Sequence, residues 1–195
     1  MASRRKYTRP IGQRRYRRMF FISTEGTKTE PQYFCMFNDE NTVVHVKVLK
    51  HRGSNPETVL REMKRHLGEK ELRKSDAAWL IVDKDRWSDT QLQSLHEWNR
   101  TDERYGLAVS NPKFEYWLVL HFEDGDGIVS ARDCVRRLKK HLPGYDKNLR
   151  VESLRSRVAE AVFRAERKDT PLCPDWPRTT GTTVYRLVKD LVNRR

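Results

Sequence analysis

Three acidic residues follow apolar runs that have the character of buried strands. Glu25 comes shortly after the run Met19–Ile22. Asp83 and Asp85 come directly after the run Ala77–Val82. Both runs are short and rich in aromatic, branched or small apolar residues, which is typical of buried strands. Ligands of open α/β sheets bind outside the carboxyl ends of the strands, so these acids stand where chemistry is expected.

If the two runs are parallel strands of one sheet, the three carboxylates converge at one edge. Carboxylates that lie close together repel each other, and a bound cation relieves that repulsion. Oxygen ligands without a neighbouring His or Cys indicate Mg²⁺ or Mn²⁺ rather than Zn²⁺. The alternative is structural: Glu25 caps a helix and Asp83-Lys84-Asp85 is a solvated turn. The acids alone do not decide between the two interpretations.

A third segment, Leu107–Phe122, has the pattern of a strand, a turn and a helix. The ordered set of short motifs in the chain is Glu25-Gly26, Thr29-Glu30, Tyr33-Phe34, Asp83-x-Asp85 and Ser110-Asn111-Pro112-x-Phe114-Glu115-x-Trp117-Leu118. This set resembles the RloB family of Toprim-like nucleases, which are related to the nuclease half of overcoming-lysogenization-defect proteins. The resemblance extends from about Phe20 to the C-terminus, where Thr182-Thr183-Val184 and Leu187-Val188 fit the family's last helix.

The resemblance implies an α/β fold of the Toprim-like (Rossmann-like) kind, with a mostly parallel sheet flanked by helices. It implies a metal-dependent nuclease that cleaves phosphodiester bonds of DNA or RNA. A role in bacterial anti-phage defence and an ATPase partner encoded nearby also follow from the family. It further implies a site role for Glu115, although this acid could instead only favour the dipole of its helix.

The acids suit the needs of phosphodiester cleavage. That reaction needs an activated water, a stabilised transition-state charge and a neutralised leaving oxygen, and one or two Mg²⁺ ions supply all three. We predict Asp83, Asp85 and Glu25 as metal ligands. Asp83 and Asp85 are two positions apart past a strand end, so both can reach one metal region. Glu25 and Glu115 are the predicted catalytic residues, with Glu25 binding metal or acting as general acid or base as its counterpart in Toprim enzymes is thought to do.

Basic and polar residues near the acids are candidate ligands of the substrate phosphates. They are Lys84, Arg86, Ser110, Asn111 and Lys113, with Lys50 and Arg52 from a basic loop that follows a strand. Each has a plainer alternative. The cations beside the acids can simply offset carboxylate repulsion, Ser110 and Asn111 can cap the next helix, and the Lys50–Pro56 loop can be solvated.

Composition bounds the class of protein. The chain has 195 residues, which suits one domain. Its net charge of +13 implies an acidic partner, and we expect nucleic acid. No apolar run approaches the ~18 residues of a membrane span, and no apolar secretory segment follows the N-terminus. The three Cys residues are widely spaced, which suits a reducing cytoplasm.

The order of patterns predicts one domain with a basic arm. Met1–Arg18 is dense in Lys and Arg and has no acid, so we expect a flexible arm that either contacts nucleic acid or only aids solubility. The domain then covers 19–195, with a helical extension over about 130–195. Predicted strands are Met19–Ile22, Thr42–Leu49, Ala77–Val82 and Gly106–Ser110. Predicted helices are Glu30–Glu40, Pro56–Lys74, Ser88–Arg104, Lys113–Phe122, Ser130–His141, Leu149–Lys168 and Gly181–Arg195.

Alternating strands and helices predict a parallel-rich sheet with right-handed crossovers. A second functional class fits the same features. The chain could be a Toprim-shaped module that binds nucleic acid or an ATPase without cutting anything.

Overall fold

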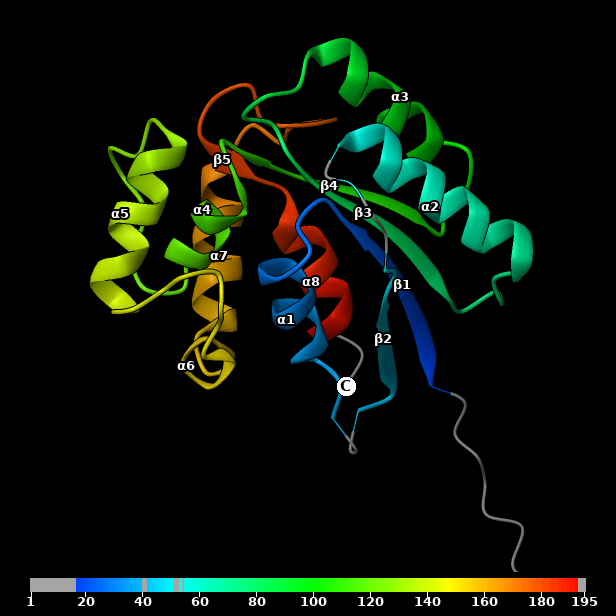
Figure 1. Ribbon diagram of the computed structural model, residues 1–195, viewed down its shortest axis with the longest axis horizontal. Coiled ribbons are helices and arrows are strands. Elements are labelled where there is room, and N and C mark those ends of the chain that lie inside the picture. The colour runs from blue at the N-terminus through cyan, green and yellow to red at the C-terminus, as the bar shows by residue number, and fades with distance from the viewer. Residues whose placement is uncertain (1–16, 40–41, 51–52, 54, 193–195) are drawn as a thin grey trace, which may run out of the picture.

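A computed structural model describes residues 17–39, 42–50, 53 and 55–192 of the chain (Figure 1). The strands are β1 (Arg18–Thr24), β2 (Val44–Val48), β3 (Ala77–Asp83), β4 (Tyr105–Asn111) and β5 (Gly181–Thr182). The helices are α1 (Thr29–Cys35), α2 (Pro56–Glu69), α3 (Asp89–Asn99), α4 (Phe114–Val119), α5 (Ala131–His141), α6 (Val151–Arg155), α7 (Val158–Lys168) and α8 (Val184–Val192). The strand order is β2-β1-β3-β4-β5, with the first four strands parallel and β5 antiparallel to β4.

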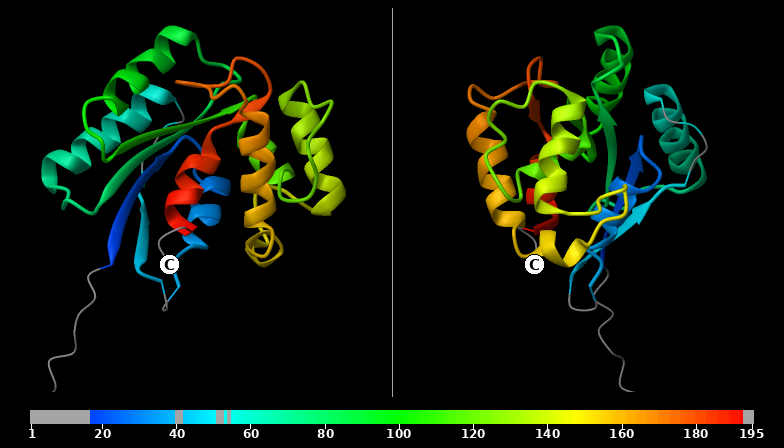
Figure 2. Two further views of the ribbon diagram at one scale, coloured as in Figure 1. Left: turned by 180° about the vertical axis from the view of Figure 1, so that it is seen from behind. Right: turned by 60° about the vertical axis from the view of Figure 1, so that its left-hand side comes forward.

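Helices cover both faces of the sheet, and each face has its own core (Figure 2). The helices α2 and α3 pack on one face through side chains such as Val59 and Leu92. The helices α1, α4, α5, α7 and α8 build the other core, which includes Phe34 and Trp117. Because both faces of β3 are covered, its sequence is apolar without alternation. The predicted α/β class and mostly parallel sheet are therefore confirmed.

The C-terminal part differs from the sequence prediction in two places. Residues 181–182 form the short strand β5 and not the first turn of the last helix. Thr182 and Thr183 hold this strand against β4, since Ser110 and Thr182 hydroxyls lie 2.9 Å apart and the Val109 N–H donates to Thr183 Oγ1 at 2.9 Å. The predicted helix Leu149–Lys168 is two helices, α6 and α7, which are separated at Ser156 and Arg157.

Helix α4 also begins later than predicted. The predicted first residue, Lys113, is the extended N-cap residue with φ −157° and ψ 169°, and the helix starts at Phe114. The first free N–H of the helix, that of Phe114, donates to Asp83 Oδ1 at 2.8 Å. The cap therefore comes from the end of β3 and not from Ser110 or Asn111.

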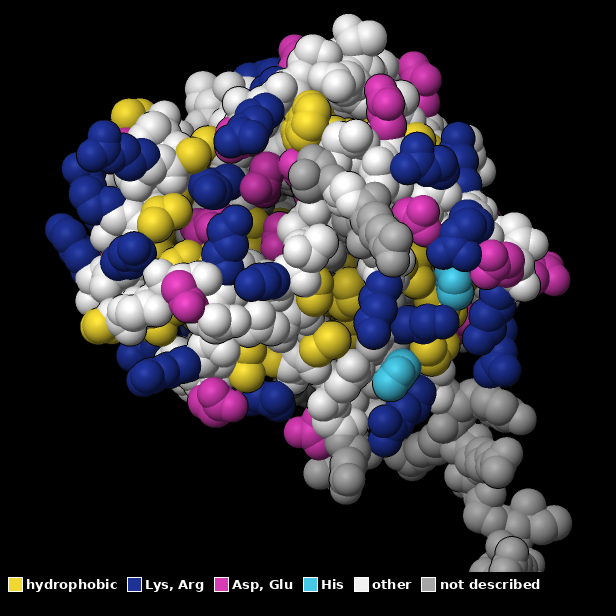
Figure 3. Space-filling model, viewed as in Figure 1, with side chains coloured by type: hydrophobic (Ala, Val, Ile, Leu, Met, Phe, Trp, Pro, Cys, Tyr) yellow, Lys and Arg dark blue, Asp and Glu magenta, His cyan; other side chains and the backbone are white. Residues whose placement is uncertain are grey.

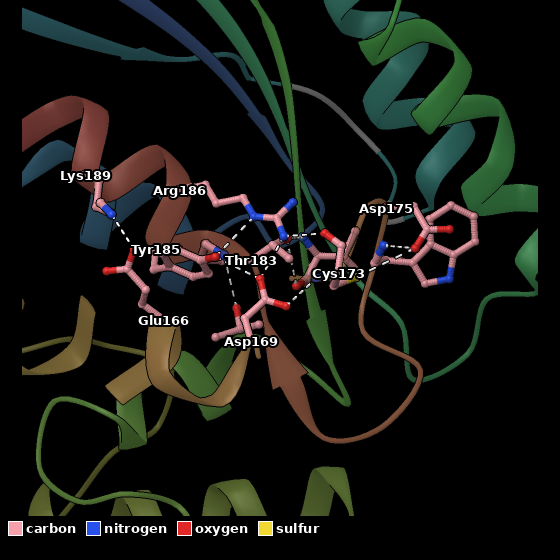
Figure 4. Close-up of polar contacts among 12 residues, drawn as sticks. Glu166, Asp169, Cys173, Asp175, Thr183, Tyr185, Arg186 and Lys189 are labelled. Atoms are coloured by element: carbon pink, nitrogen blue, oxygen red, sulfur yellow. Dashed lines mark hydrogen bonds and ion pairs between the residues drawn. The ribbon is translucent and has the colours of Figure 1, made fainter. Parts of the chain in front are cut away.

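The irregular connection before β5 is held by partly buried polar contacts (Figure 4). The Arg186 guanidinium donates to Asp169 Oδ2 at 2.7 Å and to the Cys173 carbonyl at 2.5 Å. The Tyr185 hydroxyl donates to the same carboxylate at 2.8 Å. Lys189 and Glu166 add an exposed pair between α7 and α8 at 2.5 Å. Helix α8 thus fixes the loop that leads into β5.

The edge strand β2 has a side-chain partner on its open side. Asn38 Nδ2 donates to the Val46 carbonyl at 2.9 Å, and the Val46 N–H donates to Asn38 Oδ1 at 2.7 Å. The Thr42 hydroxyl donates to the Val44 carbonyl at 3.0 Å. Both backbone groups of Val46 that face away from β1 are therefore satisfied, as buried or edge backbone groups require.

Most of the predicted N-terminal arm lies outside the described residues. Its last residue, Arg18, begins β1 and belongs to the folded domain. The Arg18 guanidinium lies 4.5 Å from the centre of the Phe20 ring, donates to the Ser75 carbonyl and pairs with Asp190 at 3.5 Å. No helix within the described part of the chain is long and apolar enough to span a bilayer.

Candidate active site

A cavity of about 550 Å³ opens at the carboxyl edge of the central strands. Glu25 follows β1, Asp83 ends β3, and Glu115 lies in the first turn of α4, directly after β4. The strands β1, β3 and β4 are parallel neighbours, so their last residues meet at one edge. The cavity is lined by Glu25, Gly26, Thr27, Lys28, Thr29, Glu30, Asp83, Asp85, Arg86, Trp87, Lys113, Phe114, Glu115 and Lys147.

Glu25 is held by two donors from β3 and the loop after it. Its carboxylate accepts the Asp83 N–H at 3.1 Å and the Trp87 indole N–H at 3.1 Å. Burial raises the pKa of Glu25, and these two hydrogen bonds offset part of the rise. The negative charge of Asp85 raises this pKa further. The turn therefore places Glu25 close to both aspartates.

Asp83 is a cavity acid on which several other carboxylates act. It is partly exposed, and its Oδ1 accepts the Phe114 N–H. Burial of the carboxyl raises its pKa well above the ordinary range, and the charges of Glu30, Glu25, Glu115 and Asp85 add to the rise. Four carboxylates thus act on Asp83 at once, which is the repulsion that a bound cation would relieve.

Glu115 points into the cavity and not to bulk water. The residue is 6 % exposed, and the Tyr145 hydroxyl donates to its Oε1 at 3.0 Å. Its other oxygen lies 3.6 Å from the Lys113 ammonium. Burial raises the pKa of Tyr145, so this phenol stays protonated and remains a donor. Tyr145 comes from the connection between α5 and α6, so the helical extension supplies part of the site.

Glu30 is a cavity acid that the sequence prediction did not assign to the site. The residue is 7 % exposed, and its Oε1 accepts the Gly26 N–H at 3.2 Å. Burial together with the charges of Glu115 and Glu25 raises its pKa to about 7. A Cβ atom at Gly26 would overlap the Glu30 carboxylate. Gly26 is therefore the feature of the sequence that could have indicated a buried Glu30, because a glycine there leaves room for the carboxylate.

Basic residues surround the acids at the cavity. Lys28 and Arg86 are exposed, and Lys113 is partly buried beside Glu115. Lys147 reaches the cavity from the connection between α5 and α6. Figure 3 shows Asp and Glu side chains in a hollow with Lys and Arg around it. Trp87, Lys28 and Lys147 were not predicted as site residues.

Five predicted substrate ligands lie elsewhere or are not described. Ser110 is fully buried against Thr182, and Asn111 Nδ2 donates to the Pro177 carbonyl at 3.0 Å. Lys84 pairs with Asp89 at 2.6 Å. None of the three lines the cavity, nor does Lys50. Arg52 lies outside the described residues.

The donor chemistry of the cavity fits a hard cation. The acids Glu25, Glu30, Asp83, Asp85 and Glu115 offer oxygen ligands only, and oxygen ligands suit Mg²⁺ or Mn²⁺. Within the described ranges, however, no three His, Cys, Asp or Glu side chains lie in an arrangement that could hold a metal ion. Glu25 accepts from the Trp87 indole, and Glu115 accepts from the Tyr145 hydroxyl. Metal binding at this site would therefore need a side-chain rearrangement.

A second cavity, of about 500 Å³, lies beside the connection between α7 and β5. Its wall includes Asp169, Leu172, Cys173, Trp176 and Arg178. The two aspartates there already pair with arginines, since Asp169 binds Arg186 and Asp175 binds Arg178. Perturbed carboxyl groups gather in the first cavity, which is therefore the candidate active site.

Comparison with known proteins agrees with the resemblance that the motifs indicate. The model of the RloB-like protein family matches residues 20–191, which is most of the chain. No curated protein and no solved structure matches the chain. The match covers every residue that lines the acidic cavity, and the chain belongs to the RloB-like family.

Proposed function

We propose that the chain is a metal-dependent nuclease that cleaves phosphodiester bonds of DNA or RNA, with a Toprim-like site. One observation carries the proposal. The acids Glu25, Glu30, Asp83 and Glu115 share one cavity, and the pKa of three of them is raised by burial and mutual repulsion. Groups perturbed in this way cluster at functional sites. Acids that favour a cation, with basic residues around them, suit a phosphate substrate.

Mg²⁺ or Mn²⁺ would be held by Glu25, Asp83 and Asp85, and the ion would supply Lewis-acid chemistry at the phosphate. The other residues have roles of their own. Glu30 has a pKa of about 7, which suits a group that takes or gives a proton near neutral pH. The Tyr145 hydroxyl orients Glu115, and the Lys113 and Arg86 cations bind phosphate oxygens.

The proposal is tested with a cleavage assay on plasmid, single-stranded DNA and tRNA, with and without Mg²⁺ or Mn²⁺. We expect Asp83→Asn and Glu115→Gln to lose metal-dependent cleavage without a fall in Tm. An asparagine keeps an oxygen that accepts the Phe114 N–H, so the start of α4 is preserved. Glu57→Gln, an exposed glutamate on α2, is the matched control and should cleave normally.

The second candidate function is a module that binds nucleic acid or an ATPase without cutting. The net charge of +13 favours binding to nucleic acid whether or not the chain cuts it. The same assay separates the two. No cleavage by the wild type under any metal condition would support the binding module. Full cleavage by Asp83→Asn would show that the acidic cavity is not the site of cleavage.

We also propose a cellular role from the family resemblance. The chain would act in the cytoplasm in defence against phage, together with an ATPase encoded nearby. Bacteria that express the wild-type chain with that ATPase should resist phage. Bacteria that express Asp83→Asn at the same level should not, and equal protection by both would contradict a nuclease role in defence.

A further inference from the structure

The positive charge of the folded domain is concentrated in its helical extension. Residues 131–168 contain twelve Lys or Arg and five Asp or Glu. Residues 19–130, which contain the cavity acids, have fifteen Lys or Arg and nineteen Asp or Glu. Figure 3 shows Lys and Arg side chains gathered over α5, on the same face of the molecule as the acidic hollow. The extension thus places a basic surface beside the candidate active site.

Four exposed cations lie at the end of α5 and in the connection after it. Lys139 and Lys140 in the last turn of α5, and Lys147 and Arg150 after it, are exposed. In the described part of the chain, no ion pair involves these four residues, which we call the α5–α6 basic surface. By contrast, Arg137 on the same helix is bound to Glu123 at 2.6 Å. The four cations are therefore available to an external anion.

The connection that carries Lys147 is fastened to the wall of the cavity. Gln32 Nε2 donates to the Lys147 carbonyl at 3.3 Å, and the Leu149 N–H donates to Gln32 Oε1 at 2.9 Å. Two residues earlier, Tyr145 donates to Glu115. These bonds tie the connection to α1 and to a cavity acid. These contacts on both sides of Lys147 hold its backbone at the cavity wall, which the residue helps to line.

The backbone of Lys147 is held in a costly conformation. Its φ is +76°, and among the described residues it is the one non-glycine residue with a positive φ. A glycine would adopt this conformation without strain. Strained backbone positions gather at functional sites, where the surrounding structure enforces them. A lysine here, at the cavity wall, points to a role for its ammonium group.

We propose that the α5–α6 basic surface binds the phosphate backbone of single-stranded nucleic acid, and that Lys147 contacts the phosphate beside the acids. The inference rests on the proposed function for the identity of that phosphate. Lysines bind phosphates as point charges without reading sequence. Glu30 and Glu115 are only 7 % and 6 % exposed, so the strand must bend inward to bring a phosphate to them. A single strand bends easily, whereas duplex DNA is stiff over about 150 base pairs.

The test measures binding of the full-length protein to a fluorescent single-stranded oligonucleotide in EDTA, over a range of salt concentrations. Each lost phosphate contact should lower the log–log salt slope by about 0.7 on a single strand. We expect a loss of about 1.4 for the double variant Lys139→Ala/Lys140→Ala and of about 0.7 for Lys147→Gly. Lys147→Gly should also keep or raise Tm, because glycine relieves the positive φ. Lys64→Ala, an exposed lysine on α2 across the sheet, should behave as the wild type.

If both variants have the same log–log salt slope as the wild type, the α5–α6 basic surface does not bind the single strand and the proposal is wrong. A duplex of the same sequence that binds as tightly, with the same losses, would overturn the preference for a single strand. Because EDTA removes divalent ions, these outcomes do not depend on cleavage. If Asp83→Asn still cleaves, the proposed function of the acidic cavity fails, and the salt slopes still test whether the α5–α6 basic surface binds nucleic acid. If Asp83→Asn is inactive and the slopes are unchanged, the surface alone fails.

Discussion

Replacing Glu30 by glutamine should stabilise the fold at alkaline pH. The folded pKa of Glu30 is about 7, against an ordinary value of 4.5. This rise means that the ionised carboxylate is disfavoured in the folded state by about 3.4 kcal/mol, at about 1.36 kcal/mol for each pKa unit. The glutamine side chain would keep an oxygen that accepts the Gly26 N–H and would lose the charge. At pH 8 we therefore expect Glu30→Gln to be more stable by about 3 kcal/mol, or about 6–12 °C in Tm.

The pH dependence gives the sharper form of this prediction. A carboxyl with a raised folded pKa binds its proton more tightly in the folded state, so it adds stability as pH falls through 7. For Glu30 this gain is about 2.5 kcal/mol between pH 8 and pH 5. The advantage of Glu30→Gln over the wild type should therefore shrink by about that amount between these two pH values.

Urea denaturation in EDTA at pH 8 and pH 5 measures both quantities. Glu57→Gln, which is exposed on α2, is the control and should shift stability by the same small amount at both pH values. A constant difference between Glu30→Gln and the wild type would show that Glu30 titrates normally in the fold. Burial and carboxylate repulsion would then not raise its pKa. Mg²⁺ or Mn²⁺ at pH 8 should stabilise the wild type more than Glu30→Gln, since the variant lacks one of the repelling charges.

Three further predictions concern the site, the core and the N-terminus. Trp87→Phe removes the indole N–H that lowers the pKa of Glu25, so the acid limb of the pH–cleavage profile should move to higher pH; an unmoved limb would show that this bond does not tune the acid. Burial lowers the pKa of His121 to about 4, so the imidazole beside Tyr33 stays neutral in the fold at pH 5 while it is protonated in the unfolded chain. The free energy of unfolding should therefore fall by about 2 kcal/mol as pH falls from 7 to 5. This loss should be missing in urea titrations of His121→Asn, and a wild-type pH slope in that variant would contradict it. Deleting residues 1–17 of the predicted arm should lower the log–log salt slope of duplex DNA binding by about 0.9 for each lost phosphate contact. A slope equal to that of the full-length protein would show that the arm does not contact DNA phosphates.

The sequence is sufficient to predict that Glu25 and Asp83 lie close together, because this depends only on the order of parallel strands. Glu25 and Asp83 follow apolar runs, and parallel neighbouring strands bring their carboxyl ends together whatever the details of packing. Glu115 enters the same cavity because α4 begins right after β4 and its first N–H donates to Asp83 at the end of β3. These placements depend on local patterns and on the sheet alone.

Other parts of the site depend on long-range packing that leaves little local signal. Tyr145 and Lys147 reach the cavity through contacts with α1 and α4, and nothing in their own segment predicts them. The burial of Ser110 follows from β5, a strand of two residues that is too short for a periodic pattern. From the sequence alone, Glu30 cannot be distinguished from any acid in the first turn of a helix. Its place in the cavity depends on Gly26, where a Cβ atom would overlap the Glu30 carboxylate.

The amide of Asn38 has a consequence for how copies of the protein meet. A sheet edge with free N–H and C=O groups is a template on which a strand of another molecule can pair. Asn38 occupies that template at Val46 with a donor and an acceptor of its own, and Thr42 covers the Val44 carbonyl. Both side-chain hydrogen bonds that protect Val46 come from Asn38, so this protection depends on one residue. Asn38→Ala would therefore leave the Val46 N–H and carbonyl without their side-chain partner on the open edge of the sheet, at a residue that does not line the acidic cavity.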